Sequence, residues 1–364
     1  MSDERLHANF MRDAICAGEP GRGRTHPNPC VGAVVVREGR VIGRGFHKGP
    51  GNPHAEIEAM RDAGDSSGSD LYVTLEPCCT FGRTPPCTEA ILASGVRRVF
   101  AAIEDPNPAV KGRGLAKLRE GGVEVHLGLL EKEAAALDPA YHHFYRQGRP
   151  LVHLKWAQTL DGRYVAAHGR YITGAEARRV VHEERAQADA ILVSAGTVLQ
   201  DDPSLTVRLQ GFDKRLVRII LDRMGTLVPE RRIFQRAPEN GPCWIIRPSG
   251  AAAPPFPSMP MVECLELPPD GQGGIDLGAL MGLLRTRQIL SLYVEAVGPL
   301  AGAFLRSGFV DRLSIHVALR LGGSGRGLLE KIGEEGKELS LEGAAIEQAG
   351  KDLIIRKEFT NPAM

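Results

Sequence analysis

Three potential metal ligands, His54, Cys78 and Cys87, restrict the folds open to this chain of 364 residues more than any other feature of its sequence. One imidazole and two thiolates can bind Zn²⁺ and leave its fourth position for a water molecule. The three residues are separated along the chain, so the fold must bring three segments to one point. The alternative interpretation is that these are ordinary packing residues, since free cysteines are often buried.

The neighbours of these residues indicate what a bound zinc ion would be used for. Glu56 follows His54 by two positions, and Pro77 directly precedes Cys78. This His-x-Glu and Pro-Cys pattern with a later cysteine is the signature of zinc deaminases, in which the metal activates water and the glutamate moves its proton. A structural zinc would need a fourth protein ligand, for which Cys79 is the nearby candidate. The pattern predicts removal of an amino group from a pyrimidine-type ring, with Glu56 as acid and base.

The surrounding sequence alternates between strand and helix patterns. Branched residues bounded by Gly and Pro mark short strands, and apolar residues at helical spacing mark helices. We expect strands at 31–36, 40–46, 71–75, 96–103 and 123–127, and helices at 3–18, 54–63 and 85–95. Such alternation predicts an α/β sandwich around one central sheet.

The length of the chain predicts two domains, because single cores rarely grow to this size. The polar and aromatic segment 138–150 reads as the link between them, which gives domains at 1–147 and 151–359. A second α/β series follows the link. Its expected strands are 151–156, 190–194, 218–222, 243–247, 291–294 and 312–318, with helices at 174–188 and 277–287 and a surface loop at 249–260.

Composition excludes several classes of function. The formal net charge is +1, without a long run of one sign, which argues against a nucleic-acid partner or an electrostatic membrane anchor. No run of residues is long and apolar enough to span a membrane, and the N-terminus does not read as a signal peptide. Seven cysteines, a sparse and odd number, do not form a disulfide framework. We therefore expect a cytoplasmic enzyme that acts on a small molecule.

The spacing of the two cysteines separates this chain from nucleic-acid base deaminases. Eight residues lie between Cys78 and Cys87, where those enzymes have two. The inserted loop resembles that of the bifunctional deaminase–reductases of riboflavin biosynthesis, and the resemblance covers nearly the whole chain. The matching segments are His26-Pro27-Asn28-Pro29, Gly45-Phe46-His47, Pro53-His54-Ala55-Glu56, Thr74-Leu75-Glu76-Pro77-Cys78, Gly82-Arg83-Thr84-Pro85-Pro86-Cys87, Asp105-Pro106-Asn107-Pro108, Leu160-Asp161-Gly162-Arg163, Gly196-Thr197-Val198, Asp201-Asp202-Pro203 and Val294-Glu295-Ala296.

The resemblance implies a fold and an activity for each half. The first half would be a cytidine-deaminase-like α/β/α sandwich that uses Zn²⁺ to deaminate a diaminopyrimidinone carrying a phosphoribosylamino group. The second half would be a dihydrofolate-reductase-like α/β domain that uses NADPH to reduce the ribose to a ribityl chain. Family members form homo-oligomers, so we expect the same here. His54, Cys78 and Cys87 would bind zinc, and Glu56 would move the proton.

The resemblance also implies the residues that contact substrate and cofactor. The deaminase pocket would be lined by Asn28, His47, Arg83, Asp105 and Asn107. The substrate of the reductase would lie near Arg185, Leu205, Arg208 and Glu295. NADPH would lie near Lys155, Ala157, Tyr171, Thr197, Asp201, Val297, Gly298, Pro299, Leu300, Ala301, Gly302 and Ala303. Arginine suits the phosphate groups because its guanidinium binds them in a bidentate manner.

The second half departs from the family pattern in several places, which leaves alternatives open. The loop 167–173 is shorter, Val297-Gly298-Pro299 replaces a glycine-rich run, and Arg223 either pairs with the 2′-phosphate of NADPH or blocks its site. In the first half, Cys79-Thr80 replaces Ser-His. The alternatives are a deaminase with an inactive reductase domain, a deaminase of another pyrimidine or of a nucleic-acid base, and a non-catalytic zinc scaffold.

Overall fold

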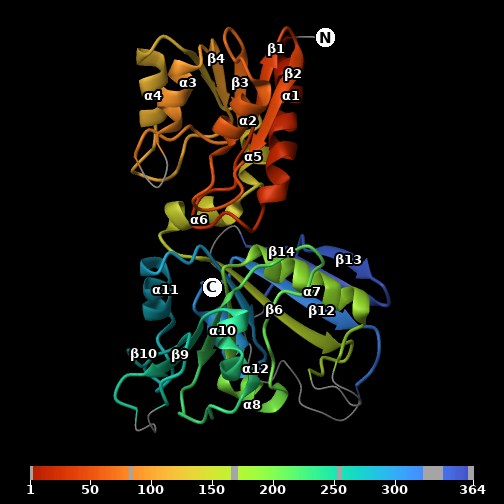
Figure 1. The fold of residues 1–364 in the computed structure, drawn as a ribbon. Coiled ribbons are helices and arrows are strands. Elements are labelled where there is room, and N and C mark those ends of the chain that lie inside the picture. The colour runs from red at the N-terminus through yellow and green to blue at the C-terminus, as the bar shows by residue number, and fades with distance from the viewer. Residues whose placement is uncertain (1–2, 82–84, 165–170, 252–255, 323–338, 360–364) are drawn as a thin grey trace. The chain divides into compact units, whose positions relative to one another are not determined.

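The computed structural model describes residues 3–81, 85–164, 171–251, 256–322 and 339–359 (Figure 1). Contacts within the chain divide it into two compact units, residues 1–148 and 149–364. Each unit has its own sheet and is described separately. No helix in the described part of the chain has both the length and the apolar character needed to cross a membrane.

A five-stranded mixed sheet forms the centre of the first unit, with strand order β2-β1-β3-β4-β5. The strand β1 pairs antiparallel with β2 and β3, whereas β3, β4 and β5 are parallel neighbours. The strands are β1 (Gly32–Arg37), β2 (Arg40–Phe46), β3 (Asp70–Val73), β4 (Arg98–Ala101) and β5 (Glu124–Leu127). All five lie within the ranges predicted from the sequence or within one residue of them.

Six helices and one 3₁₀ turn accompany this sheet in the part of the unit that the structure describes. They are α1 (Asp3–Gly18), the 3₁₀ turn Glu19–Gly21, α2 (Ala55–Ala63), α3 (Cys87–Ala93), α4 (Arg113–Glu120), α5 (Glu131–Ala135) and α6 (Pro139–Gln147). Glycine at position 45 of β2 lets α2 approach the sheet closely, because an added Cβ would lie 2.3 Å from the carbonyl oxygen of Ala55. This approach fixes the start of α2 beside the sheet.

The segment predicted as an interdomain link is a helix of the first unit, which corrects that prediction. The helix α6 has its N-cap at Asp138, whose side chain accepts a hydrogen bond from the backbone N–H of Tyr141. Ala140, Tyr141 and Phe144 are buried. The helical periodicity of α6 is hard to recognise in the sequence. Polar residues are frequent in it, and its buried face consists mainly of aromatic side chains at positions i, i+3 and i+4.

A nine-stranded sheet forms the second unit, with strand order β10-β9-β8-β7-β11-β6-β12-β14-β13. Neighbours from β10 to β12 are parallel, and β14 and β13 extend the sheet in antiparallel fashion. The strands are β6 (Leu151–Thr159), β7 (Ala190–Ser194), β8 (Val217–Leu221), β9 (Cys243–Pro248), β10 (Val262–Leu267), β11 (Ser291–Glu295), β12 (Arg312–Ala318), β13 (Ala345–Ala349) and β14 (Asp352–Glu358). The sequence predicted six of these strands but not β10, β13 or β14.

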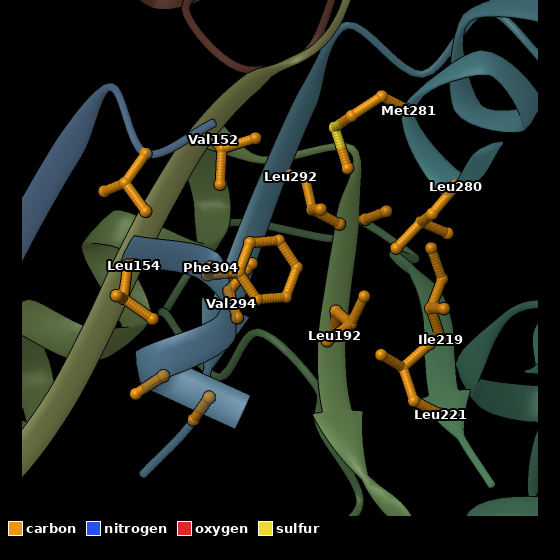
Figure 2. Close-up of a cluster of buried hydrophobic side chains, with 14 of the residues drawn as sticks. Val152, Leu154, Leu192, Ile219, Leu221, Leu280, Met281, Leu292, Val294 and Phe304 are labelled. Carbon is orange, nitrogen blue, oxygen red and sulfur yellow. The ribbon is translucent and has the colours of Figure 1, made fainter. Parts of the chain in front are cut away.

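The core of this unit occupies both faces of the sheet, as the alternation along β7 shows. Leu192 packs into one hydrophobic cluster and Ile191 into the other. On the first face, Leu280 and Met281 of one helix and Phe304 of another cover the strands (Figure 2). The helices of the unit are α7 (Ala175–Gln187), α8 (Ala195–Asp201), α9 (Arg232–Gln235), α10 (Ala237–Asn240), α11 (Leu277–Thr286) and α12 (Gly298–Arg306). Burial on both faces explains the nearly continuous apolar runs of the central strands.

Candidate active site

The structure brings His54, Cys78 and Cys87 together in the first unit. His54 is the N-cap residue of α2, Cys87 is the first residue of α3, and Cys78 lies in the loop after β3. The Nδ1 atom of His54 lies 3.2 Å from Sγ of Cys87 and 3.4 Å from Sγ of Cys78. The three potential ligand atoms lie within 4.8 Å of one another, and this group does not include Cys79.

This donor set fits a zinc ion with an open coordination position. One imidazole nitrogen and two thiol sulfurs are the ligands that zinc prefers, and three protein ligands are typical of catalytic rather than structural sites. Hydrogen bonds from Cys87 and from His54 lower the pKa of the Cys78 thiol below its ordinary value, against the opposing effect of burial. A thiolate is therefore available as a ligand at neutral pH.

Glu56 lies beside the ligands in the first turn of α2 and is only 4% exposed. Burial raises the pKa of its carboxyl group, while His54 opposes the shift. A carboxyl group with a raised pKa can both accept and donate a proton near neutral pH, which acid–base catalysis requires. The sequence placed Glu56 near the metal without ligating it, and the geometric ligand set likewise excludes it.

A cavity of about 170 Å³ opens beside these residues, and four of the five predicted pocket residues of the first unit line it. Asn28 and His47 lie on its wall and contact each other. The Asn28 amide nitrogen donates to Nε2 of His47 at 3.0 Å, while Nδ1 of His47 lies 3.0 Å from the Pro53 carbonyl oxygen, to which it donates. Burial lowers the pKa of His47, consistent with this neutral tautomer. Within the described part of the chain, the side-chain oxygen Oδ1 of Asn28 has no hydrogen-bond donor, so it is available to a polar ring.

Asp105 and Asn107 line the same cavity on the loop that follows β4. The backbone N–H of Asn107 donates to Oδ1 of Asp105 at 2.8 Å. Burial raises the pKa of Asp105 to about 6, against hydrogen bonds from the Asn107 backbone and the Tyr141 hydroxyl. The loop is held in turn by Glu76, whose carboxylate accepts backbone N–H groups of Asp105, Gly112, Gly114 and Leu115.

Two tyrosines of α6, Tyr141 and Tyr145, also line the cavity and were not predicted. The sequence carried a usable signal for the helix, because Asp138 followed by Pro139 is a favourable N-cap and first-turn pair. The interpretation of the segment as an interdomain link left both the helix and its two tyrosines out of the predicted site. Arg83, predicted to contact the substrate, lies outside the described residues.

In the second unit, the structure brings together Arg185, Glu295 and Lys155. The Nε atom of Arg185 on α7 donates to Oε1 of Glu295 at 2.6 Å, and Glu295 ends β11 in register with Lys155 on β6. Burial opposes ionisation of Glu295, but Arg185 and then Lys155 hold its pKa at about 2. Burial also lowers the pKa of Lys155. Glu295 lies at the carboxyl end of its strand, and the carboxyl ends of parallel strands are a typical place for a ligand to bind.

Arg208 and Leu205 lie on the segment after α8. The guanidinium of Arg208 lies 3.1 Å from Nε2 of His182 on α7, and Arg185 also donates to the carbonyl oxygen of Thr206 at 3.1 Å. The segment is thereby joined to α7 near the Arg185–Glu295 pair. Leu205 has a positive φ of 51° and packs its side chain into the hydrophobic core, so it offers a ligand its backbone rather than its side chain.

The residues predicted to contact NADPH lie on several elements of the second unit. Thr197 is in the first turn of α8, where its backbone N–H donates to Ser194, and Asp201 ends that helix. The guanidinium of Arg178 lies over the ring of Tyr171, with its Cζ atom 4.4 Å from the ring centroid. The remaining ones are Ala157 on β6, Val297 before α12, and Gly298, Pro299, Leu300, Ala301, Gly302 and Ala303 within α12. The loop 165–170 lies outside the described residues.

Comparisons with protein families agree with the division into two units. Residues 4–103 match the cytidine and deoxycytidylate deaminase zinc-binding region, and residues 150–355 match the RibD C-terminal domain. Together with the His54, Cys78 and Cys87 geometry, these matches define a zinc-dependent deaminase domain followed by a reductase domain.

Known relatives cover nearly the whole chain. The riboflavin biosynthesis protein RibD of Aquifex aeolicus is 39% identical over 358 residues, covering 96% of this chain and 98% of the relative. RibD of Escherichia coli is 41% identical over 346 residues, covering 89% and 92%. A crystal structure of a diaminohydroxyphosphoribosylaminopyrimidine deaminase/5-amino-6-(5-phosphoribosylamino)uracil reductase from Thermotoga maritima superposes with a TM-score of 0.85 at 35% identity, covering 98% of this chain and 99% of that one. RibD of Acinetobacter baumannii gives a TM-score of 0.83 at 33% identity, covering 97% and 99%.

The chain belongs to the RibD family. It is a bifunctional deaminase and reductase of riboflavin biosynthesis, with Zn²⁺ and NADPH as its cofactors. The first unit has the cytidine-deaminase-like fold, and the second has the dihydrofolate-reductase-like fold of the RibD C-terminal domain, as the resemblance implied. A purely nucleic-acid deaminase and a non-catalytic zinc scaffold are thereby set aside.

Proposed function

We propose that the first unit hydrolyses an amino group from a diaminopyrimidinone that carries a phosphoribosylamino group, and that the second unit reduces the ribose of the product. The deamination adds water across the ring C–N bond, forms a carbonyl group and releases ammonia. The reduction converts the ribosyl carbon attached to nitrogen into the end of a ribityl chain. The observation that carries the proposal is the cavity that places Glu56, Asn28 and Asp105 beside the His54, Cys78 and Cys87 group.

The residues of the first unit would divide the work between binding and proton transfer. His54, Cys78 and Cys87 would hold the zinc ion, which when bound supplies Lewis acidity to the attacking water. The carboxylate of Glu56 would take a proton from that water and deliver it to the ring nitrogen and the departing amine. Asn28 and Asp105, with His47 and Asn107 behind them, would orient the ring. Arg83 would pair with the phosphate.

The residues of the second unit would bind the sugar phosphate and the cofactor. NADPH supplies the hydride when bound. Arg185 and Arg208 would bind the phosphate of the substrate, and Glu295 would accept hydrogen bonds from the sugar hydroxyl groups. Leu205 would contribute backbone groups. Lys155 and Thr197, with the other residues named above on β6, α8 and α12, would contact the cofactor.

One experiment tests both halves. Protein loaded with zinc is incubated with the diaminopyrimidinone substrate and NADPH, and ammonia release and NADPH oxidation are followed together. We expect ammonia first and NADPH oxidation after it. Glu56→Gln should keep bound zinc and lower ammonia release by at least about 100-fold. It should still oxidise NADPH when the deaminated compound is supplied.

The other outcomes distinguish the alternatives. Ammonia without NADPH oxidation would mean that the reductase unit is inactive in this chain. Absence of both signals from zinc-loaded protein would contradict the proposed substrate.

We further propose that the enzyme is a cytoplasmic homo-oligomer. Free cysteines throughout the described residues support a reducing compartment. Light scattering coupled to size-exclusion chromatography tests the oligomeric state, and a monomer mass at micromolar concentration would refute the proposed homo-oligomer.

A further inference from the structure

The hydroxyl of Tyr141 on α6 contacts the Asp105 carboxylate at the wall of the deaminase cavity. It lies 3.0 Å from Oδ1 and 3.3 Å from Oδ2, and the two residues are 36 positions apart in the chain. Tyr141 is 3% exposed and Asp105 is 4% exposed. Burial, with the Asp105 charge adding to it, raises the pKa of Tyr141. The hydroxyl therefore keeps its proton and acts as the donor.

The hydrogen bonds of Asp105 are divided unequally between its two oxygens. Oδ1 accepts both the Asn107 backbone N–H, at 2.8 Å, and the Tyr141 hydroxyl. Among the residues that the structure describes, Oδ2 receives only the longer approach of the same hydroxyl. A carboxylate has about four acceptor positions. Most of the remaining capacity is therefore on Oδ2, in a residue that lines the cavity.

The helix that carries Tyr141 is itself attached to the segment that carries Asn28. The Asp138 carboxylate accepts the backbone N–H of Tyr141 at 3.1 Å and the backbone N–H of Cys30 at 2.9 Å. Cys30 lies two residues after Asn28. The first turn of α6 is thus hydrogen-bonded both to Asp105 and to the segment that carries Asn28, the two residues expected to bind the ring.

We propose that Tyr141 is a positioning residue for the deamination, which holds Asp105 so that Oδ2 accepts hydrogen bonds from N–H groups of the bound ring. The inference rests on the proposed function of the first unit. It also specifies the ring class, because a carboxylate acceptor selects a heterocycle with amino or imino donors away from the reacting carbon. A diaminopyrimidinone with an alkylamino substituent offers such donors, whereas the edge of a plain cytosine offers fewer.

The test compares Tyr141→Phe with the wild-type enzyme in ammonia release. The substitution removes one hydrogen bond to a charged group and keeps the ring that lines the cavity. We expect KM for the diaminopyrimidinone to rise about tenfold and kcat to change less than threefold, since the hydroxyl orients the ring rather than moving protons. A merely structural role would lower the melting temperature or the zinc content without this split.

A double-mutant cycle shows whether Tyr141 acts through Asp105. Asp105→Ala should raise KM at least as much, and adding Tyr141→Phe to it should have little further effect. If the alanine variant does not fold, Asp105→Asn replaces it, and the added effect of Tyr141→Phe should then be smaller than in the wild-type background. Equal effects in both backgrounds would overturn the proposal.

Tyr72→Phe is the matched control, because it removes a buried tyrosine hydroxyl that is bonded to His7 at 2.6 Å and lies outside the cavity lining. Its kinetics should match those of the wild type. NADPH oxidation with the deaminated compound should be unchanged in every variant. A KM for Tyr141→Phe within twofold of the wild type, in an enzyme that releases ammonia normally, would refute the positioning role. A wild-type enzyme that releases no ammonia would refute the proposed function instead.

Discussion

The carboxylate of Asp138 lies 3.0 Å from Nε2 of His26, although 112 positions separate the two residues. The same carboxylate caps α6 and accepts the backbone N–H of Cys30. His26 and Cys30 flank the loop that carries Asn28 into the cavity. One buried side chain therefore joins the last helix of the first unit to the loop that forms one wall of its active site.

Asp138→Ala should destabilise the first unit by about 3 kcal/mol, because it leaves two buried backbone N–H groups without an acceptor and removes a helix cap. Burial opposes ionisation of Asp138, but His26 and the hydrogen bonds hold its pKa below the usual value. The contribution is thus complete above the ordinary carboxyl pKa and is lost as the pH falls through the lowered one. Calorimetry at neutral pH measures the loss. An unchanged melting temperature would contradict the capping role.

Gly114→Ala should destabilise the first unit and weaken zinc binding. An added Cβ would lie 2.0 Å from the carbonyl oxygen of Pro77, so α4 could not stay against the loop that carries Cys78. Overpacking of this kind costs about 1–3 kcal/mol or more. Gly282→Ala in α11 is the control, because nothing lies within 4 Å of its added Cβ and alanine favours a helix. Calorimetry and zinc content per chain provide the comparison, and equal behaviour of both variants would refute the expected clash.

Arg185→Ala should impair the reductase and spare the deaminase. The substitution removes the guanidinium that donates to Glu295 at 2.6 Å. The largely buried carboxylate of Glu295 then keeps Lys155 as its cationic neighbour. The cost of a buried carboxylate that has lost its hydrogen-bonded cation predicts a fall in kcat/KM of NADPH oxidation on the order of 100-fold. The measurement uses the deaminated compound as substrate, and ammonia release from the diaminopyrimidinone is the internal control. A fall of less than threefold would exclude Arg185 from the substrate site.

The second unit should lose stability as the pH falls below about 6.5, partly because of His153. Burial lowers the pKa of His153 to about 4. An unfolded histidine titrates near 6.5, so between these values the unfolded chain binds a proton that the folded chain does not, and acidification favours unfolding.

The pH effect is measured by urea unfolding at pH 7.5 and pH 5. Both tryptophans of the chain, Trp156 and Trp244, lie in this unit and report its unfolding by fluorescence. In the wild type, Nε2 of His153 lies 2.8 Å from the hydroxyl oxygen of Ser314. His153→Gln can keep a hydrogen bond to this hydroxyl but has no group that titrates. It should reduce the loss between the two pH values by about 2 kcal/mol. The control is His126→Gln in the exposed strand β5, which should leave the loss unchanged, and a loss equal to that of wild type in His153→Gln would contradict the argument.

The prediction of strands from sequence found all five strands of the first sheet but missed three strands of the second, β10, β13 and β14. The strands β7 and β12 were predicted with their observed bounds, because β7 is apolar on both faces and β12 alternates aliphatic residues with polar ones. The strands β10 and β13 were missed, because they end the sheet and expose many side chains. Their pairing depends on the neighbouring strand rather than on an apolar pattern of their own.

The sequence by itself determined the chemistry of the first unit, because His54, Glu56, Cys78 and Cys87 are residue types whose order and spacing suit few other purposes. Only the tertiary structure decided what surrounds them. It placed Tyr141 against Asp105, and Asp138 against His26, across separations of 36 and 112 positions. Local patterns carry information about neighbours in the chain, whereas a cavity wall is assembled from distant segments by packing, so no motif in the sequence could have specified these contacts.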